Sequence, residues 1–425
     1  MIKFDIQHFA DPNTQTTATN DLSAEMKTFY SKKLLESAKP NLVHLQFGEV
    51  GELPKNGGKT VEWRKWSSFK KALTPLTEGV TPDGTPVNVG YVTATVKEYG
   101  DYTTVSDVLE LTAIDDVIGE ITAKHGDNAG VTLDTVVRNE LNTNTNVIFA
   151  PTVSGSSVTE VTSRHNIDST ARLTTDLVAK AVTKLKKVNA PKINGSYVCI
   201  IHPSVSYDLM TNPDWIDVHK YMDAKSIYNG EIGSLYGVRF VESTEAKIFY
   251  GENLTKENRN LSVYAYADKV VTVKEKVSDG DAAALIGSQV LIDGLLSDIT
   301  DATGSASANT ASFTVDDAPT SNYPAANDII CPGEGGKVYT DADGVSQTYA
   351  VYSCPFLGKG AYKYVNINST ETIVKQKGSA GTADPLNQRS TIGWKNPGFV
   401  AKTVLPEYVV RVECGSSFSD VDKNN

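Results

Sequence analysis

The feature that most constrains the fold is the stretch from residue 50 to residue 105, whose pattern fits a long two-stranded arm better than a compact domain. Strand-like segments around Val61-Glu62-Trp63 and from Val87 to Val96 are framed by Gly57-Gly58 and by a Pro/Gly-rich stretch from Pro75 to Pro86. Because an isolated two-stranded ribbon is only marginally stable in water, we expect this arm to rest on a partner subunit.

Apolar residues at helical spacing predict helices on both sides of the arm. The first covers residues 21–34, with Asp21 as its cap, and follows a polar stretch at 1–20 that has too little periodic hydrophobicity to fold alone. The second is a long helix within residues 106–147, with a weak point at Gly126 and Gly130.

A third helix is predicted around residues 178–185, and it ends at Asn189-Ala190-Pro191. A strand-like run follows at residues 197–201, and further strands are expected within 349–365 and 408–412. Helices that alternate with strands in this way predict a mixed α+β body.

Residues 253–347 change to an all-β pattern of short strands separated by turn residues, which is typical of a small sandwich or barrel. The stretch 251–350 holds 15 Asp and Glu against 6 Lys and Arg, a balance of −9, so we interpret it as a separate, solvent-facing module. Residues 55–71, by contrast, carry a balance of +5. Patches of opposite charge on one chain favour contact between neighbouring copies.

Composition narrows the classes of function. The chain of 425 residues is long enough for two or three domains, and no run of 18 apolar residues occurs, which argues against a membrane span. The N-terminus lacks the pattern of a secretory signal, so we expect a cytoplasmic site of synthesis. The net charge of −11 argues against a dedicated nucleic-acid binder but not against a shell that encloses DNA.

Motifs that could carry chemistry are incomplete. Gly58-Lys59-Thr60 is similar to the end of a phosphate-binding loop, but Leu53 stands where that loop requires glycine, so a hairpin tip is favoured. Asp341-Ala342-Asp343-Gly344 has the first two carboxylates of a calcium loop without its closing Glu, so an exposed turn is favoured over a calcium site.

Histidine and cysteine residues also lack the spacing of a reactive site. The six histidines form no metal-ligand pair, there is no Gly-x-Ser-x-Gly elbow, and no Cys-x-x-Cys pair occurs. We therefore predict no catalytic residues, no cofactor and no metal, with a catalytic triad assembled in space as the open alternative. We expect reduced, mostly buried thiols at Cys199, Cys331, Cys354 and Cys414.

Aromatic and basic residues interleave in the arm. Trp63, Trp66 and Phe69 alternate with basic residues, a pattern that fits either a protein interface or the stacking of single-stranded nucleic acid. The acidity of the chain favours the interface. We predict the following subunit-interface residues: Lys55, Lys59, Trp63, Arg64, Lys65, Trp66, Lys70, Lys71, Glu78, Asp384 and Trp394.

Several segments, taken in chain order, carry a family resemblance. The most specific are Asp384-Pro385-Leu386-Asn387-Gln388, Ile392-Gly393-Trp394-Lys395 and Arg411-Val412-Glu413. The others are Leu76-Thr77-Glu78-Gly79-Val80-Thr81-Pro82, Tyr99-Gly100-Asp101-Tyr102, Val105-Ser106-Asp107, Asn229-Gly230-Glu231-Ile232-Gly233 and Gly237-Val238-Arg239-Phe240-Val241-Glu242. Together they cover residues 21–250 and 348–418, and they resemble the major capsid proteins of tailed bacteriophages, whose Hong Kong-type shell fold is shared with herpesvirus capsids.

This resemblance implies a Hong Kong-type α+β fold and an order of parts along the chain. The implied parts are an N-terminal arm (1–49), an extended β-hairpin loop (50–105), a spine helix with a peripheral domain (106–190), the first part of an axial domain (191–252), an inserted β-rich domain (253–347) and a C-terminal axial and peripheral part (348–425). The acidic β-rich segment departs from the family pattern, so we interpret it as an inserted decoration domain on the outside of the shell.

The resemblance also implies the partners. The chain is expected to form the hexamers and pentamers of an icosahedral head that is assembled in the host cytoplasm and encloses double-stranded DNA without sequence-specific binding. A separate scaffolding protein is expected, since family members with a fused scaffold carry a long helical segment before the arm, and a portal completes the virion; no membrane is involved. Cross-links from Lys70 or Lys71 to an Asn of another subunit, known in part of this fold family, are disfavoured, because spacing does not show the buried carboxylate that the reaction needs.

Two other functions compete with a shell subunit. A host- or carbohydrate-binding virion protein would need a ligand pocket in the β-rich segment, for which Tyr264, Tyr266 and Tyr323 could supply aromatic walls. A hydrolase would need a pocket with convergent titratable residues.

Overall fold

The computed structural model describes residues 14–15, 42–54, 58–66, 69, 71–73, 75, 78–79, 84–113, 116–219, 233–292, 295–316, 328–340, 346–379 and 384–422. The chain forms two compact units. The first contains residues 1–140 and 360–405, and the second contains residues 141–359 and 406–425. These units do not test the six-part division expected from the sequence, which stays a prediction, and the helix expected at residues 21–34 lies outside the described residues.

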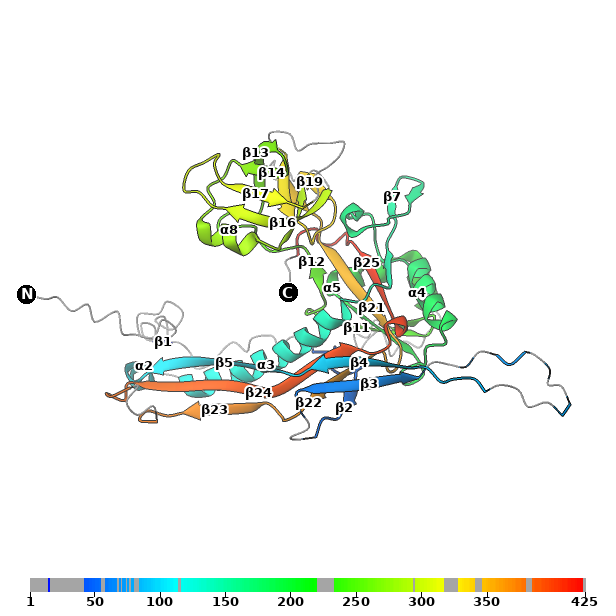
Figure 1. Cartoon of the computed structure of the whole chain (residues 1–425), viewed down its shortest axis with the longest axis horizontal. Coiled ribbons are helices and arrows are strands. Elements are labelled where there is room, and N and C mark those ends of the chain that lie inside the picture. Colours follow the sequence, from blue (N-terminus) through cyan, green and yellow to red (C-terminus); the bar gives the residue numbers. More distant parts are fainter. Residues whose placement is uncertain are drawn as a thin grey trace, which may run out of the picture. The chain divides into compact units, whose positions relative to one another are not determined.

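The first unit is built on a six-stranded sheet (Figure 1). Its order is β1-β5-β24-β22-β2, with β23 also paired to β24. The strands are β1 (Thr14–Gln15), β2 (Glu49–Gly51), β5 (Lys97–Ser106), β22 (Tyr362–Asn366), β23 (Glu371–Lys375) and β24 (Arg389–Thr403). The 15-residue strand β24 pairs with β5 along one edge and with β23 and β22 along the other, so it holds the sheet together.

A two-stranded ribbon, β3 (Thr60–Trp66) and β4 (Val89–Thr95), stands beside this sheet as a sheet of its own. The two strands are antiparallel, with Thr60 opposite Thr95 and Trp66 opposite Val89. This is the pattern that the sequence of residues 50–105 predicted, except that residues 97–106 leave the ribbon and join the six-stranded sheet as β5.

The helix expected within residues 106–147 is present as two helices, α2 (Asp107–Thr112) and α3 (Val117–Leu141). Helix α3 runs through Gly126 and Gly130 without a break, so the weak point expected there is not an interruption of the helix, and its cost in stability stays a prediction. A Cβ atom on Gly130 would lie 2.8 Å from Leu42 Cδ1, so this glycine allows the chain before β2 to approach the helix closely.

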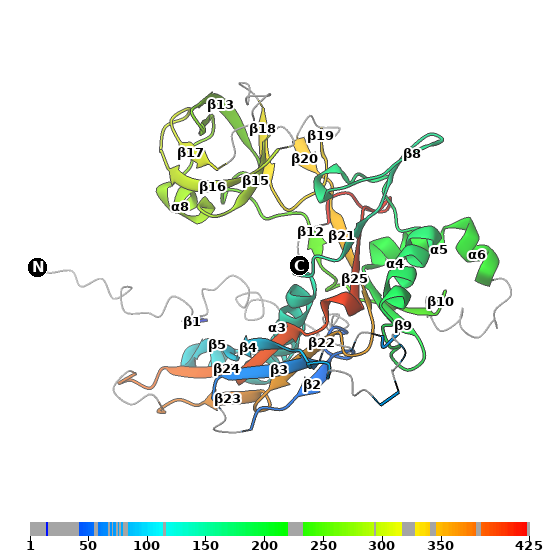
Figure 2. The ribbon, with the colours of Figure 1, turned by 45° about the vertical axis from the view of Figure 1, so that its right-hand side comes forward.

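Helix α3 lies along the sheet of the first unit (Figures 1 and 2), and two polar contacts fix it there. The Trp394 indole on β24 donates to Asn128 Oδ1 at 2.9 Å. The buried Asp134 carboxylate lies 2.6 Å from His44 Nδ1 and accepts the Leu45 amide at 3.1 Å. These contacts connect the segment just before β2, which contains His44 and Leu45, and strand β24 to the same helix.

The second unit contains a seven-stranded mixed sheet with the order β10-β11-β9-β21-β25-β6, in which β12 also pairs with β21. The strands are β6 (Val147–Phe149), β9 (Tyr197–Ile201), β10 (Ser234–Leu235), β11 (Val238–Glu242), β12 (Ile248–Phe249), β21 (Val351–Leu357) and β25 (Val409–Cys414). Helices α4 (Thr175–Lys187), α5 (Pro203–Met210) and α6 (Pro213–His219) accompany it. The helix and strands expected near 178–185, 197–201, 349–365 and 408–412 are confirmed.

One apolar core joins α4 to this sheet. Helix α4 begins at the Thr174 cap, whose side chain accepts the Leu177 amide, and its apolar stripe Leu177, Val178, Ala181, Val182 and Leu185 is buried. Strands β9, β21 and β25 are buried at every residue, which is typical of strands in the middle of a covered sheet.

The β-rich segment folds as a closed six-stranded barrel with the order β13-β14-β17-β16-β15-β18 (Figure 2). Its elements are β13 (Leu261–Ala267), β14 (Val270–Val273), α8 (Asp279–Leu285), β15 (Gln289–Ile292), β16 (Leu295–Thr303), β17 (Ser312–Val315) and β18 (Ile329–Pro332). The barrel has its own apolar core, and the space among those side chains does not admit a water molecule. Closure leaves the barrel without a free edge.

Two short hairpins complete the described chain. They are formed by β7 (Thr152–Ser154) with β8 (Ser157–Thr159) and by β19 (Val338–Thr340) with β20 (Ser346–Thr348). No described helix is both long and apolar enough to span a bilayer.

Candidate assembly surface

The ribbon presents two different faces because side chains alternate along its strands. Val61 and Ala94 are buried and Trp63 is half-buried, so the face that carries them packs against the chain's own first unit. The Trp63 indole occupies the space above Gly51 on β2, where a Cβ atom would lie 3.1 Å from Nε1.

The other face of the ribbon is exposed. It carries Trp66, Val89 and Tyr91, and Trp66 and Tyr91 are 65% and 69% exposed. Arg64 lies opposite Tyr91 in the ladder, with Glu62 3.6 Å from its guanidinium. Large exposed aromatic residues beside an arginine are the composition of a protein interface. Of the predicted interface residues on the strands, Arg64 and Trp66 therefore lie on the open face, whereas Trp63 and Lys65 lie on the opposite one.

The other predicted interface residues that the structure describes do not form one cluster on the surface. Lys59 precedes β3 at the end of the ribbon, and Lys71 and Glu78 are exposed in the long connection between the strands. Lys55 and Lys70 lie outside the described residues. Gly58-Lys59-Thr60 leads into β3 instead of closing a hairpin, so its interpretation as a hairpin tip is wrong. The loop expected at Asp341-Ala342-Asp343-Gly344 also lies outside the described residues.

Asp384 and Trp394 are buried in their own subunit, with exposures of 6% and 4%. Asp384 Oδ2 accepts the Arg389 amide at 2.8 Å, and Trp394 donates to α3. Their contacts stabilise the first unit, so the proposal of an interface rests on the exposed residues. Family motifs do not distinguish a residue that shapes a subunit from one that touches its neighbour.

A groove of about 540 Å³ is lined by residues of β5, β24 and β23. Gly393 on β24 is paired with Tyr102 on one side and with Ile373 on the other, so two exposed apolar side chains flank a position without one. Lys395 and Glu98 form an ion pair at one end of the groove. This arrangement offers an apolar notch with polar rims to another protein surface.

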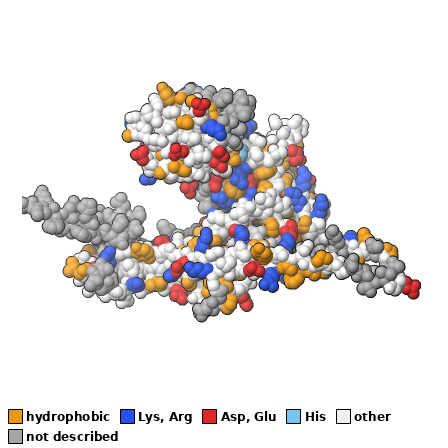
Figure 3. Space-filling model, in the orientation of Figure 1, with side chains coloured by type: hydrophobic (Ala, Val, Ile, Leu, Met, Phe, Trp, Pro, Cys, Tyr) orange, Lys and Arg blue, Asp and Glu red, His pale blue; other side chains and the backbone are white. Residues whose placement is uncertain are grey.

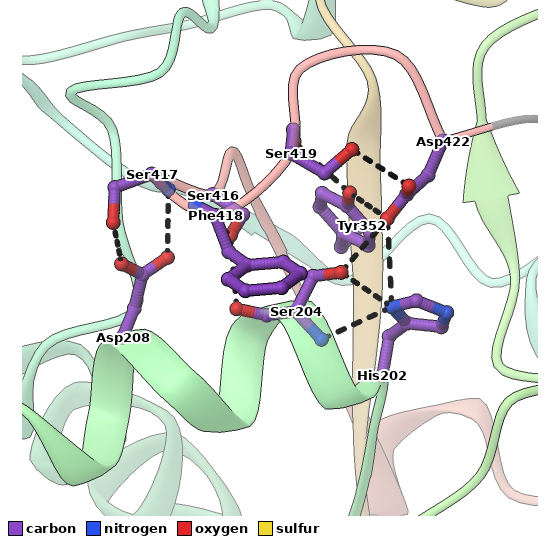
Figure 4. Close-up of polar contacts among 9 residues, drawn as sticks. All are labelled: His202, Ser204, Asp208, Tyr352, Ser416, Ser417, Phe418, Ser419 and Asp422. Atoms are coloured by element: carbon purple, nitrogen blue, oxygen red, sulfur yellow. Dashed lines mark hydrogen bonds and ion pairs between the residues drawn. The ribbon is translucent and has the colours of Figure 1, made fainter.

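A cluster of His, Ser and Asp side chains in the second unit tests the hydrolase alternative (Figure 4). Ser204 Oγ lies 3.1 Å from His202 Nδ1 and donates to Asp422 Oδ2 at 2.8 Å, and that carboxylate oxygen lies 3.9 Å from the same Nδ1. A catalytic triad needs the serine and the carboxylate on different ring nitrogens, so that the imidazole can relay a proton. This cluster does not have that geometry.

The cluster instead attaches the C-terminal segment to α5. His202 caps α5, Tyr352 donates to Asp422 Oδ2 at 2.6 Å, and Asp208 accepts the Ser417 amide at 3.0 Å. Burial lowers the pKa of His202, against a smaller raising effect of Asp422. Burial alone would raise the pKa of Asp422, but hydrogen bonds from Ser419, Tyr352 and Ser204 lower it below the usual value.

Among the residues that the structure describes, neither the thiols nor the side chains able to bind a metal form a reactive site. All four cysteines are free and buried, as expected, and Cys354 and Cys414 lie with their sulfur atoms 3.9 Å apart. Burial raises the pKa of Cys331 to about 12, which keeps that thiol protonated and unreactive. The described chain brings no three His, Cys, Asp or Glu side chains together as metal ligands.

Comparison with known proteins points to phage capsids. A family model described as phage capsid protein matches residues 90–282, from β4 into α8. Over this range the chain is similar to phage capsid proteins. The match favours a structural capsid subunit over the host- or carbohydrate-binding alternative. No curated protein sequence matches it at a significant level.

Solved capsid structures share the fold of this subunit over nearly its whole length. The capsid of cyanophage P-SCSP1u matches with a TM-score of 0.54 at 12% identity, covering 92% of this chain and 93% of that one. The capsid subunit of cyanophage Pam1 matches with a TM-score of 0.55 at 12% identity, covering 93% and 98%. At such low identity the likeness shows the fold alone, an α+β capsid fold.

Proposed function

We propose that the chain is the major capsid protein of a tailed phage, with the Hong Kong-type form of the fold, and that it assembles into an icosahedral head around double-stranded DNA. The observation that carries this proposal is the exposed face of the β3–β4 ribbon. It combines Trp66, Tyr91 and Arg64 on an element that is a two-stranded sheet by itself. A marginal ribbon with an aromatic outer face gains stability when a neighbouring copy covers it.

The groove at Gly393 supports this proposal from the receiving side. Its apolar walls, Tyr102 and Ile373, are 54% and 40% exposed, and its volume of about 540 Å³ suits one or two large side chains. A ribbon and a groove at different places on one chain give a heterologous contact, which closes into rings when the rotation between copies permits. Hexamers and pentamers are such rings.

The barrel is proposed to be an inserted decoration domain on the outside of the shell. The stretch 251–350, which contains the barrel, carries the charge balance of −9, and an inward position would place like charges within a Debye length of about 8–10 Å of packaged DNA. The family model extends past residue 253 into the barrel, so the insertion itself rests on the independent core and not on the family match. A separate scaffolding protein and a portal complete the proposed assembly.

Assembly by variants of the ribbon tests the proposal. The Trp66→Ser subunit should stay folded by circular dichroism, because its indole is exposed, and should fail to form shells in sedimentation and negative-stain microscopy. Ile286→Ser is the matched control, since Ile286 is a 47% exposed apolar residue next to α8 of the barrel, away from the ribbon in sequence and contacts. Normal shells from Trp66→Ser would contradict the proposal, as would equal loss of assembly in both variants.

A further inference from the structure

Strand β6 is an open edge of the mixed sheet in the second unit. It stands at one end of the strand order, and β25 is its neighbour. In a parallel ladder alternate residues bond to the neighbour, and here Arg411 and Ala150 donate to the carbonyls of Asn146 and Glu413. Ile148 therefore faces β25, and the backbone groups of Val147 and Phe149 point away from it. An edge of this kind accepts a further strand from another chain.

Helix α4 turns this edge into a groove of about 630 Å³. Ile148, Phe149, Val161 and Ala179 give it an apolar lining, and the exposed polar side chains of α4 form its rim. The Lys184 ammonium reaches across the groove to Asn146 Oδ1 and the Val147 carbonyl, at 3.3 and 3.5 Å. The Val147 amide donates to the Thr145 carbonyl at 3.0 Å, so the outward backbone groups of Phe149 are what this edge offers to a further strand. The groove thus combines apolar surface, this strand edge and positive charge.

Charge is separated along the groove. At one end Lys180 is neutralised by Asp176 at 3.1 Å and by Glu160 at 3.9 Å. At the other end Lys184 and Lys187 have no carboxylate within ion-pairing distance in the described part of the chain. Figure 3 shows Lys and Arg side chains gathered over the region of α4. An occupant should therefore carry a carboxylate near the C-terminal end of α4.

We propose that this groove binds an extended, carboxylate-bearing segment of a second copy of the chain, which adds a strand to β6. This inference rests on the proposed shell function, which supplies the second copy. The charge of the chain favours this occupant, since 51 acidic and 40 basic residues make a neighbouring copy an acidic partner for the basic end of α4. Nucleic acid fits less well, because it cannot pair with a strand edge and has no use for the apolar lining.

Cross-linking of mixed shells tests the contact directly. Shells assembled from equal amounts of ¹⁴N- and ¹⁵N-labelled chains are treated with a carbodiimide, which joins a lysine amine to a carboxylate with loss of water. The expected products are mixed-isotope peptides that link Lys184 or Lys187 to an Asp or Glu of another copy. The hydrogen exchange of the Phe149 amide should slow by about tenfold or more between free subunits and shells, as for a newly formed strand bond.

Variants on α4 supply the matched control. Lys187→Glu should reduce the yield of shells by about tenfold, which corresponds to ~1.4 kcal/mol of lost interaction. Lys186→Glu makes the same charge change on the same exposed helix end, outside the groove lining, and should keep the yield within about twofold of the unchanged chain.

The outcomes separate the two proposals. If the unchanged chain forms no shells when its scaffolding protein is present, the proposed function fails. If it forms shells while the Phe149 amide is not protected, or while Lys186→Glu and Lys187→Glu lose assembly equally, the groove is not the contact and this inference is overturned. Protection of Phe149 that appears only when double-stranded DNA is added would assign the groove to nucleic acid and would overturn it as well.

Discussion

A buried carboxylate in the second unit allows a quantitative prediction. Glu413 on β25 is fully buried and lies between two guanidinium groups. Arg164 approaches it with Nε and Nη2 at 2.7 and 2.8 Å, and Arg411 Nη2 lies 2.9 Å from Oε1. The Arg411 side chain is only 7% exposed, and its pKa is lowered by burial and raised by the carboxylate. The negative charge of Glu413 is what allows two cations in this core.

Glu413→Gln keeps the shape of the side chain and removes the charge. The amide nitrogen then faces an Arg N–H group, and the buried Arg411 is left with no anion in contact. Removal of one partner from a buried pair costs about 3–5 kcal/mol, and we expect a loss of that size in the free energy of unfolding. Arg164, which is 22% exposed and stacks 3.5 Å from the Phe249 ring, can recover part of its hydration.

Guanidinium titration of the soluble subunit, followed by circular dichroism, measures the loss. Glu160→Gln is the control, because its 83% exposed side chain sits 3.9 Å from Lys180 and should change stability by less than about 0.5 kcal/mol. A loss below about 1 kcal/mol for Glu413→Gln would refute the reasoning, since it would mean that water or relaxation compensates the buried guanidinium.

Three further predictions use other parts of the chain. Gly126→Ala should stabilise the subunit by about 1 kcal/mol, since no atom lies within 4 Å of the new Cβ. Gly393→Ala should destabilise it by about 1–3 kcal/mol, because its Cβ would lie 2.6 Å from the Asp101 carbonyl oxygen. The denaturant midpoints of the two variants measure both changes. The C-terminal segment should loosen on acidification, because the folded pKa values of His202 and Asp422 are both lowered, so that stability falls as pH drops below about 6.5 and again below about 3.8. Hydrogen exchange at residues 416–422 measures the loosening of this segment. Equal protection at pH 7 and pH 5, in the unchanged chain as well as in His202→Asn, would contradict the prediction. Replacement of residues 253–347 by a Gly/Ser linker should leave a soluble, assembly-competent subunit, because the barrel has a separate core; insoluble protein, or a cryo-microscopy map with the barrel on the inner surface, would show that the assignment is wrong.

Local patterns predicted the elements well where one face of an element is buried against a continuous core. Helix α4 and strand β9 have regular apolar periods, and both were predicted within a few residues. The ribbon and the barrel were also predicted, because turn residues separate their short strands. These are features that nearby residues decide.

Features decided by distant contacts were missed. The close approach of Leu42 to Gly130 was not predicted, and neither was the start of α3, which is marked by Asp116, whose carboxylate accepts the Gly119 amide. An Asp cap is a sequence signal and could have been used. The length of β24 could not have been predicted, because Pro397 interrupts the strand pattern. The structure accommodates this proline by an irregularity in the pairing with β5 between Asn396 and Phe399.

The candidate surface was predicted in part. The alternation of residues along β3 separates Arg64 and Trp66 from Trp63 and Lys65, and a reader of the sequence can count that alternation but cannot know which face is covered. The His202, Ser204 and Asp422 cluster was not predicted, since Asp422 is 218 residues from Ser204 in sequence and reaches it only through the C-terminal segment.

The position of β25 in the strand order has a consequence for the timing of synthesis. This strand lies between β21 and β6, so β6 waits for a neighbour that the ribosome makes about 260 residues later. At translation rates of about 5–20 residues per second, that interval is roughly 10–50 s. Until then the second unit lacks an interior strand and the Glu413 carboxylate that pairs with Arg164. Nascent chains on one messenger therefore cannot pair β6 with its neighbour until residues 409–414 have been made.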